Sequence, residues 1–463
     1  MANATTPDFT RELADFLSGL TCERIPRRVV ERAKDLVLDH LGVALHSTKL
    51  PWSRIVRDYA VAAGGRSEST VYGSAGKTGR RDAALANGTA AHGIELDDTH
   101  NESFSHPGTV VIPAALAVAE PTHASGREFL AAVVAGYEAQ CRAGAAATAA
   151  MSNGFHATAV CGVFGAAAAA CRLMRLSGAQ VDSAFGLAVS MASGVMQFTE
   201  DPQNNMVKRL HGGLPAQNGI LAADLAAAGF QGPRAALDGR YGFVRMFARS
   251  GEAARLTRGL GAAWEIDQIS VKLYACCRMF HAFVDSIREC RDESGARADD
   301  IEHAEVIVPQ MSLEGRMEYR PRSVMSAQYS LPYAAAATLA LDPQDPRSFS
   351  EEAFTRPEML ALMDRVTGRG DPELDRLLPA QYPGGVRLTL KDGRTLSRML
   401  PDSIGTPERP LDREGIACKF RALTSGMLDA RAQERLMSAV FSLDEMDDIG
   451  ALAVLVGKPG RAP

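Results

Sequence analysis

One segment of the chain, residues 92–113, combines three of the ten histidines with four carboxylates, all of which can transfer protons. Its histidines and carboxylates are His92, His100, His106, Glu95, Asp97, Asp98 and Glu102. The residues on both sides of the segment are mostly alanine and other small or apolar residues. Charged groups are costly beside such packing unless they are paired or used, so we take the segment as the first candidate for an acid–base site.

The acidic cluster is predicted to continue a helix that spans residues 80–96. A helix extended this far would place His92, Glu95 and Thr99 at positions i, i+3 and i+7, on one face. A solvated helix end, with its carboxylates paired to nearby Lys or Arg, is the alternative. Metal binding is a third interpretation, but H-x-x-E-x-x-x-x-H is not the H-E-x-x-H spacing of zinc enzymes.

Three later segments carry groups that could complete such a site. His156 precedes the least charged helix, where it could fill the core, cap the helix or help bind an anion. Lys208 and His211 stand before a Gly-Gly break, which suits either a basic loop or a cation for a substrate carboxylate. Cys277 and His281 would lie one helical turn apart, so a thiolate–imidazole nucleophile is a further hypothesis, although nothing marks an oxyanion hole.

The elements that must position these groups differ between two parts of the chain. Residues 1–263 show helical periodicity and use alanine and glycine more than large apolar residues, which suits closely packed helices. Helices are expected at residues 26–44, 80–96, 110–119, 126–149, 156–173, 181–195 and 217–228. This part is therefore predicted to be a large all-helical domain.

Residues 264–401 mix strand and helix signals. Residues 301–309 alternate like a strand, and residues 385–400 indicate a hairpin with Asp392-Gly393 at its turn. Helical patterns cover residues 280–294, 329–341 and 351–365. We expect a mainly α protein in which this part forms a smaller α+β lid domain, while residues 402–463 return to helix and pack back on the first domain.

Composition limits the classes of protein that the chain can represent. With 463 residues, 46% of them hydrophobic and 23% charged, it is predicted to be globular with at least two domains. A net charge of −5 gives no basic footprint for nucleic acid, and no stretch suggests a membrane span or a signal peptide. The eight cysteines lack C-x-x-C spacing, which indicates reduced thiols in a cytoplasmic protein.

Seven blocks in order along the chain resemble the MmgE/PrpD family. They are A-N-G-T-A-A-H-G-I-E-L-D-D-T, S-H-P-G-T-V-V-I-P-A, G-F-H-A-T-A-V, K-R-L-H-G-G-L-P-A-Q-N-G, D-G-R-Y-G-F, K-L-Y-A-C-C-R-M-F-H and A-Q-Y-S-L-P-Y. The resemblance covers nearly the full length. It implies a helical domain with an α+β lid, a homodimer, and chemistry that needs no metal or organic cofactor.

The family includes 2-methylcitrate dehydratases, cis-aconitate decarboxylases and iminodisuccinate epimerases, so the resemblance implies a small di- or tricarboxylate substrate. Carried over by motif position, its site residues are Glu95, Thr99, His106, His156, Lys208, His281 and Tyr333. Two departures matter. Many relatives have Asp at the position of Glu95, and H-G-G-L-P stands where relatives often have H-x-G-x-A.

These residues permit one acid–base mechanism. His106 and His281 are expected to be the acid and base, Glu95 to orient a histidine or act as base, and Thr99 to bind substrate. The expected carboxylate-binding residues are Lys208, His156, Tyr333 and Lys272. The leading expectation is a cofactor-independent lyase that dehydrates a 2-methylcitrate-like substrate. Decarboxylation, epimerisation of an imino-dicarboxylate, and non-catalytic polycarboxylate binding stay open.

Overall fold

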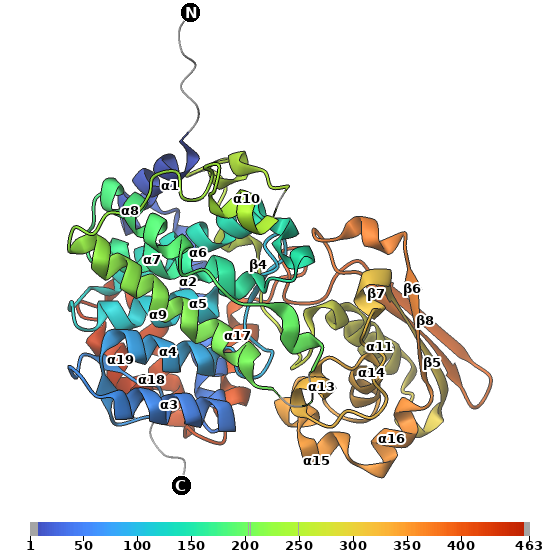
Figure 1. The fold of residues 1–463 in the computed structure, drawn as a ribbon. Helices are drawn as coiled ribbons and strands as arrows, with labels where there is room; N and C mark the ends of the chain where they lie inside the picture. Colours follow the sequence, from blue (N-terminus) through green and yellow to red (C-terminus); the bar gives the residue numbers. More distant parts are fainter. Residues whose placement is uncertain (1–7, 202, 204, 249, 458–463) are drawn as a thin grey trace, which may run out of the picture.

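Two hydrophobic cores organise the computed structural model, which describes residues 8–201, 203, 205–248 and 250–457 (Figure 1). The first core belongs to a helical body and the second to a smaller lobe that carries a sheet. The predicted fold class, mainly α with a smaller α+β lid, is confirmed. Within the described residues, no helix combines the length and apolar character needed to cross a bilayer.

The helical body is assembled from the first part of the chain and from its C-terminal helices, whose apolar residues enter the same core. Its helices are α1 (Phe9–Ser18), α2 (Arg27–Ser47), α3 (Pro51–Ala63), α4 (Arg80–Ala91), α5 (Gly108–Ala119), α6 (Gly126–Ala146), α7 (Ala157–Leu173), α8 (Gly178–Val189), α9 (Val207–Ala227), α10 (Phe243–Ala248), α17 (Arg413–Thr424), α18 (Ala430–Phe441) and α19 (Gly450–Gly457). Short strands β1 (Ser69–Thr70) and β2 (Lys77–Thr78) pair at its surface end.

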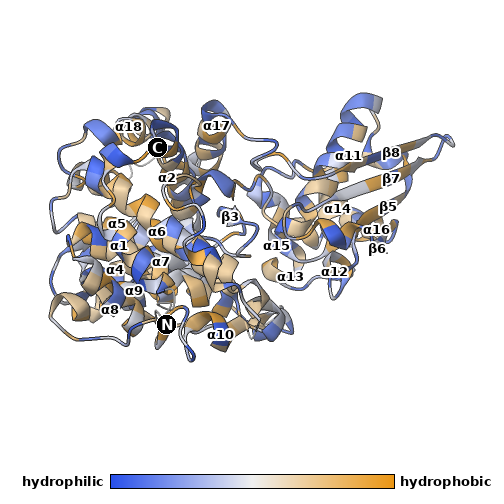
Figure 2. Cartoon of the chain, turned by 90° about the horizontal axis from the view of Figure 1, so that it is seen from above, coloured by the Kyte–Doolittle hydropathy of each residue, from blue (hydrophilic) through white to orange (hydrophobic). Residues whose placement is uncertain are grey.

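Small residues let the central helices of this body approach closely. A Cβ atom added to Gly136 of α6 would lie 2.9 Å from the carbonyl oxygen of Gly165 on α7. Nearly every residue of α5 and α7 is buried, and Figure 2 shows these helices mostly in hydrophobic colours. Close packing of this kind leaves little space for polar groups inside the body.

The predicted helix over residues 80–96 is wrong at its C-terminal end. Helix α4 stops at Ala91 with His92 as its C-cap. A Cβ at Gly93 would lie 2.7 Å from the side chain of Ser47, and Glu95 takes a left-handed backbone conformation with φ +59°. The chain therefore turns inward after His92, and the predicted common helix face of His92, Glu95 and Thr99 does not exist.

The predicted Gly-Gly break is also wrong, because α9 begins at Val207 and continues through Gly212, Gly213 and Pro215. A Cβ at Gly212 or Gly213 would lie 2.4 and 2.2 Å from backbone oxygens of α4. The two glycines allow α9 to cross α4 at short range. Lys208 and the residues that follow it are thereby fixed in the first turn of a helix that packs on α4.

The lid contains a four-stranded sheet in the order β6-β5-β7-β8, on which helices pack from one side (Figure 1). Strand β5 (Ile301–Pro309) pairs parallel with β6 (Val366–Asp371) and antiparallel with β7 (Gly384–Leu390), which forms the predicted hairpin with β8 (Thr395–Leu400). The lid helices are α11 (His281–Ser294), α12 (Gln310–Leu313), α13 (Val324–Gln328), α14 (Leu331–Ala340), α15 (Glu351–Phe354) and α16 (Pro357–Met363). The single helix predicted over residues 351–365 is divided in two, since Pro357 starts a new helix.

Candidate active site

A cavity of about 100 Å³ lies where the helical body meets the lid. Six of the eight predicted site residues line it: Glu95, Thr99, His106, His156, Lys208 and Lys272. Residues that are up to 177 positions apart in the chain therefore line one cavity. The two remaining predicted residues, His281 and Tyr333, are not among its lining.

A short pair of strands brings the two parts of the site together. Strand β3 (Thr99–His100) pairs antiparallel with β4 (Ile269–Ser270), with Thr99 opposite Ser270. Lys272 follows β4 by two residues and so reaches the loop of the helical body that contains Glu95. The hydroxyl of Thr99 is buried and has no hydrogen-bond partner within the described residues, so it is available to a ligand in the cavity.

A cationic cluster is formed by Glu95 with Lys208, Arg209 and Lys272, and its members Glu95, Lys208 and Lys272 line the cavity. The Glu95 carboxylate accepts hydrogen bonds from Lys208 Nζ, from Arg209 Nη1 at 2.7 Å and from Lys272 Nζ at 3.4 Å. Burial alone would raise the pKa of Glu95, but the three cations hold it well below its usual range. A carboxylate so occupied is a poor proton acceptor, so neither role expected for Glu95 matches its contacts.

A second group, the histidine cluster, joins Asp97 to His92 and His106, and His106 lines the cavity. Asp97 Oδ2 lies 2.7 Å from His92 Nδ1 and 3.3 Å from His106 Nδ1. His106 Nδ1 also lies 2.8 Å from the carbonyl oxygen of Asp98, which can only accept a hydrogen bond, so Nδ1 carries the proton. The other ring nitrogen, Nε2, is then left as the reactive position of His106.

The remaining members of the histidine cluster are His156 and His211. Their Nδ1 atoms lie 2.9 Å apart, and the His156 ring stacks on that of His92 with centroids 5.7 Å apart. Burial lowers the pKa of His106 to about 3 and that of His211 to about 4, and it lowers the pKa values of His92 and His156 as well. The free site therefore holds neutral imidazoles beside an ionised Asp97, whose pKa the histidines keep low against the effect of burial.

The lid adds cavity residues that the sequence did not single out, and the polar ones are Arg278, Arg316, Tyr329 and Tyr382. Lys208 Nζ lies 5.3 Å from the centre of the Tyr329 ring, a cation–π contact. Arg278 and Tyr329 stand in the K-L-Y-A-C-C-R-M-F-H and A-Q-Y-S-L-P-Y blocks, so the motifs pointed to the right segments. Which residue of each block reaches the cavity depends on the direction of its side chain.

His281 and Tyr333 lie outside the lining of this cavity. Tyr333 donates its hydroxyl to the carbonyl of Ser348 in the lid core, whereas Tyr329, the C-cap of α13 four residues earlier, lines the cavity. His281 Nε2 lies 3.4 Å from the carbonyl oxygen of Cys276, and its ring packs on that of Tyr274. This placement leaves the proposed Cys277–His281 nucleophile without support, since Cys277 precedes the helix that His281 begins.

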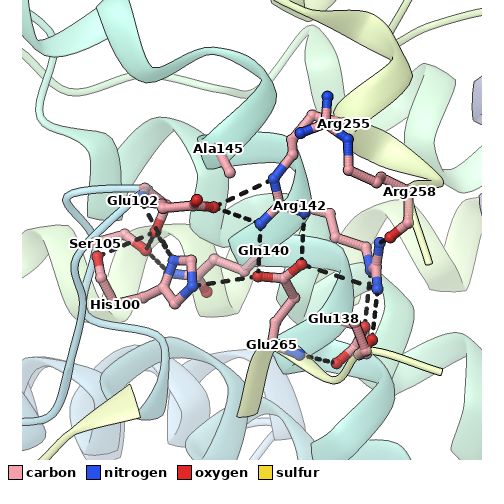
Figure 3. Close-up of polar contacts among 12 residues, drawn as sticks. His100, Glu102, Ser105, Glu138, Gln140, Arg142, Ala145, Arg255, Arg258 and Glu265 are labelled. Carbon is pink, nitrogen blue, oxygen red and sulfur yellow. Dashed lines mark hydrogen bonds and ion pairs between the residues drawn. The ribbon is translucent and has the colours of Figure 1, made fainter. Parts of the chain in front are cut away.

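An ionic network holds the loop that leads to His106, as Figure 3 shows. His100 Nδ1 accepts a hydrogen bond from the backbone N–H of Ser103, so His100 Nε2 carries the proton toward Glu265 Oε2 at 3.2 Å. Arg255 binds both Glu265 and Glu102. Arg142, fully buried, binds Glu138, whose other oxygen accepts the N–H of Glu265. The loop is thus tied to the helical body through His100 and Glu102.

Two family-level comparisons agree with this arrangement. The MmgE/PrpD N-terminal domain matches residues 11–255, and the MmgE/PrpD C-terminal domain matches residues 274–445. The chain belongs to the MmgE/PrpD family. Its family domains therefore meet at the cavity, and the C-terminal one extends past the lid sheet into the helices that return to the helical body.

Relatives of this MmgE/PrpD protein align over nearly their whole lengths. A cis-aconitate decarboxylase of Aspergillus terreus is 30% identical over 98% of this chain and 97% of its own length. The human cis-aconitate decarboxylase is 30% identical over 97% of this chain and 95% of its own length. That of Mus musculus is 28% identical over 97% of this chain and 93% of its own length.

Within the described residues, no group of three His, Cys, Asp or Glu side chains could hold a metal ion.

Proposed function

We propose that this MmgE/PrpD protein is a carboxy-lyase that removes CO2 from cis-aconitate or a close tricarboxylate analogue. The observation that carries the proposal is a single cavity lined by buried cations on one side and by His106 on the other. The relatives that are similar over their full lengths are cis-aconitate decarboxylases, which favours decarboxylation over the dehydration expected from the motifs.

The chemistry requires charge stabilisation and one proton. The bond from the CH2 carbon to its carboxyl carbon breaks, and its electron pair forms a new terminal double bond. The electrons of the original double bond take a proton at the far carbon, and CO2 leaves. Negative charge spreads toward the carboxylates that remain, where Lys208 and Lys272 stabilise it.

His106 is the proposed proton donor. Burial keeps it neutral in the free site, but Asp97 opposes that effect, and an incoming tricarboxylate adds negative charge near Nε2. Both charges favour the imidazolium form. Substrate binding would therefore favour protonation of His106. His106 then transfers this proton to the far carbon of the substrate's original double bond.

Dehydration of a hydroxytricarboxylate is a second candidate, because a neutral histidine with an open Nε2 is also suited to removing a proton. One experiment separates the two. The purified protein is incubated with cis-aconitate and, separately, with 2-methylcitrate, and products are followed by carbon-13 NMR. Release of CO2 from cis-aconitate supports the proposal. Alkene formed from 2-methylcitrate, with cis-aconitate unchanged, would replace it by dehydration.

A further inference from the structure

Arg278 is an unusual arginine, because it is buried and only partly used. It opens the short 3-10 helix Arg278–Phe280 in the lid, is 8% exposed and lines the cavity. Its Nη2 donates to Asp402 Oδ1 at 2.6 Å. Its Nε and Nη1 are buried and have no hydrogen-bond partner within the described residues.

The orientation of this guanidinium is fixed from two sides. Asp402 also accepts the backbone N–H groups of Tyr382 at 3.2 Å and of Ser403 at 2.8 Å, so the carboxylate that holds Arg278 is itself held. The Tyr382 ring, which lines the same cavity, lies 5.0 Å from the guanidinium carbon. Arg278 is therefore positioned before any ligand binds, which lowers the cost of binding one.

Arg142, the fully buried arginine of the helical body, shows what a purely structural arginine looks like here. All three of its nitrogens donate: Nε to Glu138, Nη1 to the carbonyl of Arg258 and Nη2 to that of Ala263. Buried N–H groups are nearly always paired in folded proteins, because an unpaired one costs desolvation energy. At Arg278 the missing partners are explained if a ligand in the cavity supplies an acceptor.

We propose that Arg278 binds one carboxylate of the substrate from the lid side and so selects tricarboxylates over dicarboxylates. The inference rests on the proposed function and deepens it. In the cationic cluster, Lys208, Arg209 and Lys272 all contact the single carboxylate of Glu95. In the proposed complex, this cluster binds the remaining part of the substrate. Because Arg278 belongs to the lid, a bound tricarboxylate links lid and helical body through its own charges.

The test measures binding without turnover. Tricarballylate carries three carboxylates, whereas 2-methylsuccinate and glutarate each lack one of them. Calorimetry gives the affinities of all three for the wild type and for Arg278→Gln. The double variant Arg278→Gln, Asp402→Asn removes the carboxylate that the single change leaves unpaired and so guards against a folding defect. Arg291→Gln, a lid arginine whose Nε also lacks a described partner but which does not line the cavity, is the control.

The wild type and Arg291→Gln should bind tricarballylate about 100-fold more tightly than at least one of the dicarboxylates, as expected for a buried charge pair. Both Arg278 variants should lose that preference, while binding of the dicarboxylate that lacks the carboxylate held by Arg278 stays within about threefold of the wild type. An unchanged preference in the variants, or no preference in the wild type, overturns the inference. Because no reaction is followed, a protein that binds in this way yet releases no CO2 would refute only the proposed function.

Discussion

The cationic cluster and the histidine cluster are each built around one buried carboxylate, and these carboxylates stand two residues apart, at Glu95 and Asp97. Glu95 is surrounded by three permanent or nearly permanent cations, while Asp97 contacts two imidazoles. The first arrangement fixes charge in place, and the second leaves a proton that can move. Within one loop, the neighbours rather than the residue type decide whether a carboxylate helps to bind the substrate or to transfer a proton.

This difference predicts that substitutions in the two clusters will change different kinetic constants. Changes in the histidine cluster should lower kcat, since they affect a step made in the transition state. Changes in the cationic cluster should mainly raise KM or lower stability, since its charges already act before reaction, with a smaller effect on kcat from the charge that develops in the transition state. The following variants test that division, beginning with the largest expected effect.

Replacing His106 by Gln should lower kcat by about 10³-fold or more, because the proton donor is lost while a polar side chain of similar reach remains. KM for the tricarboxylate should change little. Steady-state decarboxylation assays give both values, and circular dichroism checks the fold. Turnover within tenfold of the wild type would remove His106 from the mechanism.

Replacing Asp97 by Asn should lower kcat by about 10²-fold, because His106 loses the carboxylate that favours its protonated form. The pH profile should shift as well, with the optimum moving toward lower pH. Asp182→Asn, at a buried carboxylate of α8 outside this cavity, is the matched control and should leave both values unchanged. Equal effects of the two changes would contradict the role given to Asp97.

Replacing Glu95 by Gln should act mainly on stability. Lys208, Arg209 and Lys272 would repel one another without their shared carboxylate, and loss of one partner of a buried ion pair costs about 3–5 kcal/mol. Urea unfolding monitored by fluorescence measures the loss. A large fall in kcat with unchanged stability would place Glu95 in the reaction instead of in the cationic cluster.

Replacing Glu265 by Gln should have the smallest effect, a decrease of roughly tenfold or less in kcat, because it loosens the loop that carries His106 without touching the cavity. Glu265→Asp, which keeps the charge, should recover part of the lost activity. The comparison of kcat between the two variants is the measurement. A larger loss for Asp than for Gln would show that the charge of Glu265 does not hold the loop.

Much of this architecture was predictable from sequence patterns. Helical periodicity and the Asp392-Gly393 hairpin turn gave the fold class, since both depend on local rules. The motif blocks gave six residues of the cavity. The local rules failed at Glu95, whose left-handed backbone turns the acidic loop inward, and at the Gly-Gly pair of α9, where close contact with α4 keeps the helix continuous.

The differences between the predicted site residues and the cavity lining have a common cause. His281, Tyr333 and Tyr329 all lie in matching blocks, but burial and side-chain direction decide which of them reaches the cavity. Arg278 carries no spacing signal at all, because its unpaired N–H groups become visible only when its surroundings are known. Long-range packing, which no single segment contains, selects the members of the site.

The most direct test of the account is the pKa of His106 measured by nitrogen-15 NMR, with the histidine signals assigned by comparison with His106→Gln. In the free protein, burial should hold this pKa well below 6.5, near 3, and the signal should show the proton on Nδ1. Saturation with tricarballylate should raise the pKa, because the bound carboxylates favour the imidazolium form. A pKa near 6.5 in the free protein, or one that tricarballylate does not raise, would contradict the proposed proton transfer by His106.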